Sequence, residues 1–458
     1  MKQLMRNVVA IAVAGGCAAL AQAAATPEQI SQIGKTYTPW GAEQAGNADG
    51  SIPAYTGPIK PPASYDPKNP GIRPDPFANE KPLFSISGQN LTQYADKLTE
   101  GMQALLRKYP TFRMDIYPSH RTAAYPEYFQ QNAIKNASAC KTKNDELGLE
   151  GCYGGTPFPF PKTGNEVMWN RLLKFDQFAF ETRAFTTSLV DTRGTRTVTG
   201  VSSMQIQYPI FDPQRTGPIG DKDIYEMLRV DFLDPARKNG EKIVVHDSID
   251  MVDQGRRAWQ YLPGQRRVKL APDIAYDTPS PTSGGVTTTD ELAIFYGALD
   301  RYNFKLHGKK EMYIPYNTYK IRDPNVCPDT LGEGTKNHLN PDCMRWELHR
   351  VWVVEATLKE GQRHIYPRRM IYLDEDLYSV GISDNFDRAG QIYRVNHSLP
   401  ITFYEGTGHM TDEAVTHDLA TGAYHRQQNA TMGGGWVVTA PRPDNYFSPA
   451  AMTGGGIR

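Results

Sequence analysis

Short segments in which apolar and polar side chains alternate follow one another from about residue 176 to residue 432. Alternation with a period of two places successive side chains on opposite faces of a β-strand. Tight turns separate the segments, among them Asn239-Gly240, Glu360-Gly361 and Ala389-Gly390. Strands joined by such turns pair antiparallel, because parallel strands need long crossover connections. The sequence therefore predicts a mainly β chain built on a large antiparallel meander.

The predicted strands are 203–207, 225–232, 242–250, 257–262, 267–270, 302–309, 310–316, 346–358, 363–373, 378–384, 391–396, 401–405 and 424–431. The sequence Thr288-Thr289-Asp290-Glu291 interrupts them with the spacing of a capping box. It predicts a short helix through Phe295, and we expect a helix at 288–297 to act as a lid.

Two helices are expected before the strands: one at 90–109, where apolar side chains recur every three or four residues, and a shorter one at 125–136. Ten prolines from Pro39 to Pro82 exclude a long helix or a central strand in that segment. Aromatic residues recur among the prolines, so we expect an extended arm that wraps over the body. The predicted organisation is 1–23 signal peptide, 24–85 Pro-rich arm, 86–175 helical and disulfide-loop segment, 176–432 β half-barrel and 433–458 C-terminal tail.

The N-terminus has the pattern of an export signal. Lys2 and Arg6 precede an apolar stretch at 8–20, and Ala21-Gln22-Ala23 provides the small residues that signal peptidase needs. We therefore expect a periplasmic protein. The alternative is a lipoprotein anchored through Cys17, but the leucine usual three positions before such a cysteine is absent.

Four further cysteines form two local pairs, Cys140 with Cys152 and Cys327 with Cys343. Four cysteines allow three connectivities, and the short loops favour these local disulfides. A zinc site is the alternative, but neither pair has the CxxC spacing that zinc ligation favours. Disulfides persist in an oxidising compartment, which agrees with export.

The sequence lacks the common catalytic motifs. The ten histidines form no HExxH, and there is no GxSxG elbow or phosphate-binding loop. His409 and His417 with Asp412, Glu413 and Asp418 are interpreted as a polar surface loop, and 374–376 as a solvated hairpin turn. We predict no enzyme activity, no cofactor and no metal. Fifty basic residues balance fifty acidic ones, so nucleic acid is not expected as a partner.

Two segments carry a family resemblance: RRAWQYLPGQRRVKLAPDIAYDTP at 256–279 and VWVVEATLKEGQRHIYPRRMIYLDEDLY at 351–378. They resemble exported Gram-negative proteins related to the lipoprotein-sorting carriers LolA and LolB, and more closely a larger family catalogued as a domain of unknown function. The resemblance implies an antiparallel half-open β-barrel with covering helices that binds a hydrophobic ligand. This chain is more than twice as long as those carriers, which leaves the cargo open.

The resemblance also implies that part of the bulky strand face lines a cavity; a packed core is the alternative. The predicted ligand-binding residues are Trp259, Tyr261, Trp352, Val354, Ile371 and Leu373. Arg257, Arg267 and Arg369 are predicted to contact an acidic headgroup at a cationic mouth, since guanidinium groups suit carboxylate or phosphate. Alternatively, such arginines mark solvated strand edges.

The function expected from the resemblance is that of a periplasmic carrier or chaperone for a lipid, lipoprotein acyl chains or a hydrophobic small molecule. An envelope exporter or an outer-membrane barrel protein is the expected partner. Peripheral contact of the protein with a membrane surface is compatible with this function. The alternatives are an envelope interaction protein with a solid core and, less favoured, a secreted hydrolase.

Overall fold

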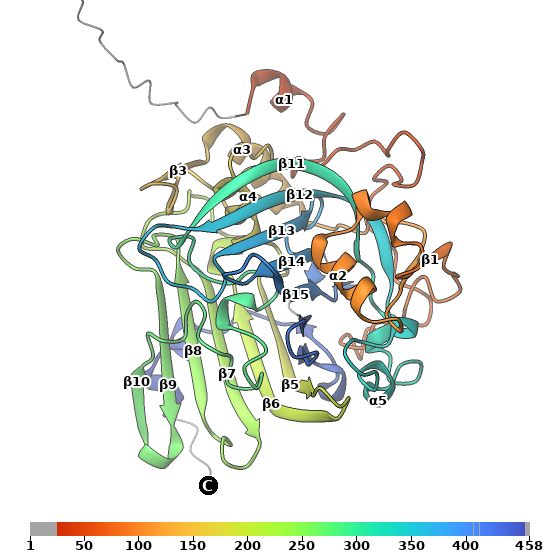
Figure 1. Ribbon diagram of the computed structural model, residues 1–458. Coiled ribbons are helices and arrows are strands. Elements are labelled where there is room, and N and C mark those ends of the chain that lie inside the picture. The colour runs from red at the N-terminus through yellow and green to blue at the C-terminus, as the bar shows by residue number, and fades with distance from the viewer. Residues whose placement is uncertain (1–24, 406, 412, 454–458) are drawn as a thin grey trace, which may run out of the picture.

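The main sheet curves around the body of the protein as one open surface (Figure 1). The structure is a computed structural model that describes residues 25–405, 407–411 and 413–453. The strands of the sheet are β1 (Phe84–Ile86), β2 (Met114–Ile116), β5 (Ala179–Val190), β6 (Arg196–Gln207), β7 (Ile224–Asp234), β8 (Lys242–Ser248), β9 (Arg256–Leu262), β10 (Arg267–Leu270), β11 (Tyr302–Pro315), β12 (Trp346–Leu358), β13 (Arg368–Asp374), β14 (Gly381–Phe386), β15 (Ile392–Ser398), β18 (Ala414–Asp418), β19 (Tyr424–Asn429) and β20 (Val437–Val438).

These strands pair in the order β1-β2-β12-β13-β14-β15-β18-β19-β5-β6-β7-β8-β9-β10, with β11 beside β12 and β20 beside β5. The pairings are antiparallel apart from one parallel bridge between β2 and β12. The two ends of this strand order do not pair with each other in the described part of the chain, so the sheet is half-open. The prediction of a mainly β, antiparallel, half-open fold is confirmed.

Two details of the predicted strands are wrong. The segments 302–309 and 310–316 form the single strand β11, which continues through an irregularity between Leu306 and Gly308. The segment around His417, interpreted as a surface loop, contains β18 and β17 (His409–Met410); β17 pairs with β16 (Ile401–Thr402), which lies in the strand predicted at 401–405. A further pair, β3 (Lys141–Lys143) and β4 (Gly148–Glu150), lies apart from the main sheet.

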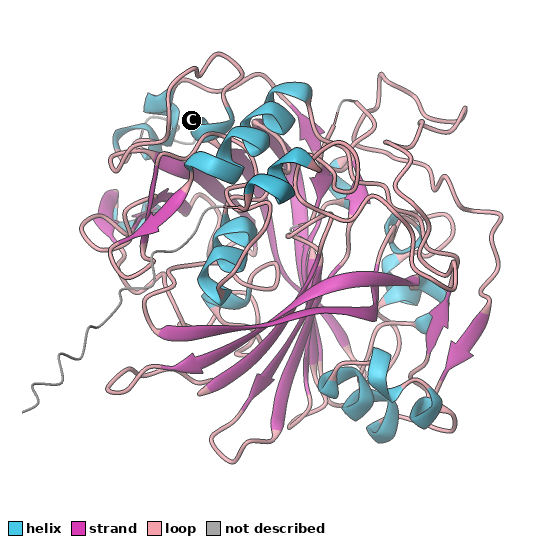
Figure 2. Cartoon of the chain, turned by 90° about the horizontal axis from the view of Figure 1, so that it is seen from above, coloured by secondary structure: helices cyan, strands magenta, loops and turns pink. Residues whose placement is uncertain are grey.

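In the described part of the chain, five α-helices accompany the strands, and they lie on both sides of the curved sheet (Figure 2). They are α1 (Pro27–Ser31), α2 (Glu100–Lys108), α3 (Glu127–Ala139), α4 (Gly164–Leu172) and α5 (Asp329–Gly332). Within the described ranges, no helix is both long and apolar enough to cross a membrane.

The helix predictions need three corrections. The helix expected at 90–109 starts only at Glu100, because the Thr99 side chain caps it by accepting a hydrogen bond from the Met102 N–H group; two short 3-10 turns precede it. The helix expected at 288–297 is a single 3-10 turn, Thr289–Glu291, although its capping box is present. Helices α1, α4 and α5 were not predicted, although Thr163 and Glu166 at the start of α4 have capping spacing. The prediction at 125–136 matches α3.

The Pro-rich arm packs on the body through single aromatic and charged side chains. The Trp40 indole is 2% exposed and donates a hydrogen bond to Asp376 Oδ1 at 3.3 Å. Arg121 pairs with the same carboxylate at 2.6 Å, and Glu375 accepts from Lys309 at 2.6 Å. The segment 374–376 is therefore a buried anchor for the arm, which corrects its interpretation as a solvated turn.

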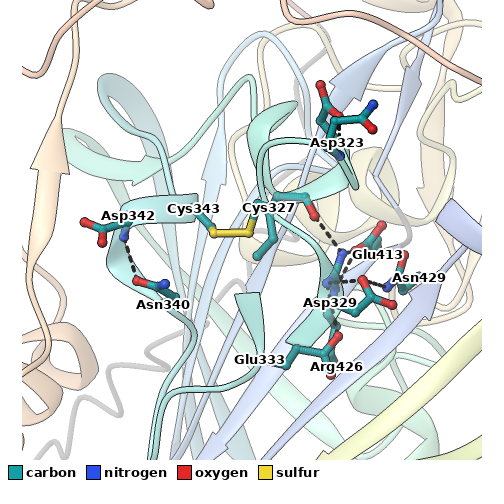
Figure 3. The surroundings of a disulfide bond; sticks show 12 residues. Asp323, Cys327, Asp329, Glu333, Asn340, Asp342, Cys343, Glu413, Arg426 and Asn429 are labelled. Carbon is teal, nitrogen blue, oxygen red and sulfur yellow. Dashed lines mark hydrogen bonds and ion pairs between the residues drawn. A yellow bond between two sulfur atoms is a disulfide. The ribbon is translucent and has the colours of Figure 1, made fainter. Parts of the chain in front are cut away.

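Both predicted disulfides, Cys140–Cys152 and Cys327–Cys343, are present. The second one closes the loop that carries α5 (Figure 3). In that loop Glu333 reaches Arg426 of β19 at 3.1 Å. The loop is thus tied to the outer side of a central strand.

Candidate functional site

A cavity lies between one half of the curved sheet and the segment that connects β10 to β11, named here the cover segment (residues 271–301). The sheet contributes Phe185, Thr187, Ser202, Met204, Ile206, Glu226, Leu228, Val230, Phe232, Ile243, Val245, Arg256, His425, Gln427 and Gln428. The cover segment contributes Ile274, Ser280, Pro281, Thr282, Thr289, Leu292, Ala293 and Tyr296, and Arg171, Lys174 and Tyr208 complete the lining. The space between these atoms is about 1100 Å³, including the part open to solvent.

The wall from β5 to β8 is mostly apolar because alternate residues of each strand face the cavity. On β7 these are Leu228, Val230 and Phe232, with Glu226 at the end near α4, and on β8 they are Ile243 and Val245. Alternation along a strand places every second side chain on one face, so the remaining residues of β7 and β8 point away from the cavity. A wall of this composition suits an apolar ligand body.

The cover segment is held to the sheet by buried ion pairs. Asp290 accepts from Arg369 Nη1 at 3.0 Å and lies 3.0 Å from His364 Nε2. Although burial opposes it, the Arg369 charge and the His364 hydrogen bond keep the pKa of Asp290 below its usual range. The next residue, Glu291, accepts a hydrogen bond from Asn385 at 3.2 Å. These contacts fix the middle of the cover segment over the concave face.

Charged side chains line the end of the cavity near α4, and they have partners within the protein. Arg256 makes two hydrogen bonds of 2.7 Å to Asp247, and its guanidinium lies 4.0 Å from the ring centroid of Tyr296. The Tyr296 hydroxyl donates to Glu226 at 2.7 Å. Arg171 donates to the backbone carbonyl of Ala293 in the cover segment. This end of the cavity therefore consists of paired charges.

The structure places Trp259 and Tyr261 on the opposite face of the sheet from the cavity. Trp259 pairs in register with Val244, whereas the cavity-lining Val245 pairs with Ala258. Trp259 and Tyr261 pack with a small apolar cluster that includes Phe447, from the C-terminal part of the chain. Neither residue is part of the cavity lining.

Trp352, Val354, Ile371 and Leu373 share the concave face of β12 and β13, as their cross-strand pairing shows. Helix α4 packs against β11 and β12 there. Val354, Ile371 and Leu373 are fully buried in the main core. The chain itself fills this half of the concave face, so the four residues lie outside the cavity lining.

The three predicted headgroup arginines lie in different environments. Arg257 and Arg267 are exposed on the outer hairpin β9–β10. Arg369 has no exposed surface and holds the cover segment through Asp290. The structure therefore does not bring the three together at one opening.

Sequence reasoning missed the lining of β5 to β8, even though those strands were largely predicted. Alternation along 225–232 and 242–250 separates two faces, but it does not tell which face is concave. One sequence feature could have indicated the site, namely the polar residues His425, Gln427 and Gln428 close together in a predicted strand. Most residues that the neighbouring strands contribute to the cavity wall are apolar.

The cluster around His409 and His417 is buried, which corrects its interpretation as a polar surface loop. Both imidazoles are 1% exposed, and Glu413 is fully buried against Arg426. Burial lowers the pKa of His409 to about 4. Among the described residues, no group of three His, Cys, Asp or Glu side chains is arranged to hold a metal ion. Asp412 lies outside the described residues, as do Cys17 and the expected signal peptide.

Together, the fold and the cavity define a half-open antiparallel β protein with a covered, largely apolar internal cavity. The family described as "Protein of unknown function (DUF1329)" matches residues 85–453, and the chain belongs to that family. This confirms the resemblance to a larger family catalogued as a domain of unknown function.

The protein PA3922 of Pseudomonas aeruginosa is 36% identical over 449 residues, which cover 95% of each chain. Among solved structures, a DUF1329 family protein from Desulfovibrio piger is 15% identical, with a TM-score of 0.39, over 61% of this chain and 92% of the other. The LolA superfamily protein NE2245 from Nitrosomonas europaea is 10% identical, with a TM-score of 0.36, over 63% and 98%.

Proposed function

We propose that this protein is a periplasmic carrier that binds the apolar part of a lipid or other hydrophobic molecule between β5–β8 and the cover segment. The observation that supports this most is the cavity wall formed by alternate apolar side chains of four adjacent strands. The disulfides Cys140–Cys152 and Cys327–Cys343 fit an oxidising compartment such as the periplasm. An envelope exporter or an outer-membrane barrel protein is the proposed partner, and no catalytic role is proposed.

The energetics favour a ligand with a sizeable apolar body. Each methylene group that leaves water contributes about 0.8 kcal/mol, whereas association itself costs ~4–15 kcal/mol. A ligand with only a few methylene groups would therefore bind weakly. A long acyl chain offsets the association cost, and the buried ion pairs of Asp290 would then limit how easily the cover segment opens.

Native mass spectrometry and lipid extraction of the protein purified from its own periplasm test the proposal first. We expect a reproducible co-purifying hydrophobic compound. A protein without ligand that also fails to bind the neutral fluorescent probe N-phenyl-1-naphthylamine would overturn the carrier proposal and favour an interaction protein.

A matched pair of variants on β7 locates the binding site. Leu228 lines the cavity, whereas Leu233 on the same strand is 41% exposed. Leu228→Trp fills the cavity and should weaken probe binding at least about tenfold, since it removes space for more than one methylene group. Leu233→Trp should bind like the unaltered protein. Equal binding by both variants would place the ligand elsewhere.

A further inference from the structure

The polar side chains of β19 stand out from the rest of the cavity wall. Gln427 is 1% exposed, and neither its Nε2 nor its Oε1 has a hydrogen-bond partner among the residues that the structure describes. The same holds for Oε1 of Gln428 and for Nε2 of His425. All three residues line the cavity. A buried polar atom without a partner costs free energy, so three such residues at one place indicate a site for a partner.

Strand alternation places His425 and Gln427 on the cavity face, and a β-bulge adds Gln428 to them. The register between β19 and β5 shifts between Arg426 and Asn429, so that Gln427 and Gln428 face the single residue Thr187. Gln428 has a φ of 58°, in the left-handed region that glutamine seldom adopts. Bulges re-aim side chains next to functional sites, and a strained residue persists where its surroundings hold it.

Hydrogen bonds on the outer face hold the bulge in place, and those to Glu333 and Asp329 come from the disulfide loop (Figure 3). Arg426 Nη2 donates to Glu413 at 2.6 Å, and its Nη1 to Glu333 at 3.1 Å. Asn429 donates to Asp329 of α5 at 2.8 Å. The residues before and after the bulge are therefore anchored on the side away from the cavity. This fixes the position of the two glutamine amides between them.

The polar cluster carries no net charge. His425 lies 3.0 Å from the Thr287 hydroxyl, and burial lowers its pKa to about 3, so the imidazole is neutral at neutral pH. Gln427 offers both donor and acceptor groups, its NH2 and its carbonyl oxygen, whichever way its amide is oriented. A charged ligand group beside these residues would lose its hydration without gaining an opposite charge. The cluster thus suits an uncharged group that both donates and accepts.

We infer that Gln427, with His425 and Gln428, binds an uncharged amide or hydroxyl group at the end of the ligand's apolar body. This rests on the proposed carrier function and specifies the ligand class: a neutral amphiphile such as a fatty amide or a fatty alcohol, rather than a free fatty acid. The apolar body then lies along β6 to β8.

Displacement of the neutral probe N-phenyl-1-naphthylamine by lauramide, methyl laurate and laurate tests this, because the three compounds share one acyl chain. Lauramide should bind about tenfold more tightly than methyl laurate, which has no donor. Gln427→Leu should remove that preference and leave the affinity for methyl laurate unchanged. Gln205→Leu on β6, where Gln205 accepts from Tyr446 away from the cavity, is the control and should keep the preference.

The outcomes separate the two proposals. If none of the compounds displaces the probe, the carrier function fails and the inference fails with it. If all three bind equally, or if Gln427→Leu keeps the preference for lauramide, only the amide recognition is overturned. Gln427→Met provides a second apolar variant, and the melting temperature of each shows that it is folded. Loss of an amide without a protein partner should not lower that temperature.

Discussion

Replacing Arg369 by methionine should destabilise the protein strongly, because it removes the positively charged arginine partner of the buried Asp290 carboxylate. Arg369 is fully buried and makes three contacts: Asp290 at 3.0 Å, Asn385 at 2.9 Å and the Ile294 carbonyl at 3.3 Å. Removing one partner of a buried ion pair typically costs ~3–5 kcal/mol. We therefore expect the free energy of unfolding of Arg369→Met to fall by about that amount in urea titrations.

The neighbouring arginine supplies a matched control. The Arg368 side chain is 37% exposed and pairs with Glu355 at 2.7 Å. An exposed ion pair contributes about 1 kcal/mol or less, so Arg368→Met should be mild. The double variant Arg369→Met with Asp290→Asn should be more stable than Arg369→Met alone, since no charge is then left unpaired. Similar unfolding free energies for Arg368→Met and Arg369→Met would refute the role given to this pair.

The pH dependence gives a second measurement on the same pair. The pKa of Asp290 is lowered in the folded protein, so its contribution is present above the usual carboxyl pKa and is lost on acidification. Arg369→Met lacks this contribution at every pH. The difference in stability between the two proteins should therefore shrink below about pH 4. A difference that stays constant in acid would argue against an electrostatic origin.

Two further predictions concern the outer face of the sheet. Asp384 accepts a hydrogen bond from the Gly101 N–H group at 2.8 Å, and burial raises the pKa of its carboxyl group to about 7 from the usual 3.8. Because the folded protein holds this proton more tightly than the unfolded chain, the free energy of unfolding falls as the pH rises from about 4 to about 7. Asp384→Asn should remove up to about 3 kcal/mol of the decline between pH 5 and pH 8 in urea titrations; an unchanged decline would contradict this. Trp259→Asp should leave probe affinity unchanged but expose the segment around Phe447 to limited proteolysis, since these residues pack together. If Trp259→Asp loses probe binding while its C-terminal segment stays resistant to proteolysis, Trp259 belongs to the ligand site and this prediction is wrong.

The strands could be predicted well because alternation depends on local sequence, whereas the ligand face could not. On β7, Met227 and Leu228 are both apolar, yet only Leu228 lines the cavity. Met227 is covered by the C-terminal segment, which lies about 220 residues away in the sequence. Which of two apolar faces is covered depends on such distant segments, and period-two patterns do not contain that information.

The same argument explains why bulky strand faces at 352–373 did not mark a cavity. Trp352 and Leu373 lie on the concave side, where a half-open sheet would hold a ligand, but α4 occupies that space. Helix α4 has no exposed face, since each of its residues is buried. A helix of this kind acts as part of the core, so it divides the concave face into a filled half and the half from β5 to β8. Helix α4 therefore leaves the half beside β19 as the site proposed for the ligand. There β19 contributes the hydrogen-bonding groups of His425, Gln427 and Gln428 to a mostly apolar wall, so in the proposed function a few residues of one strand would set ligand selectivity.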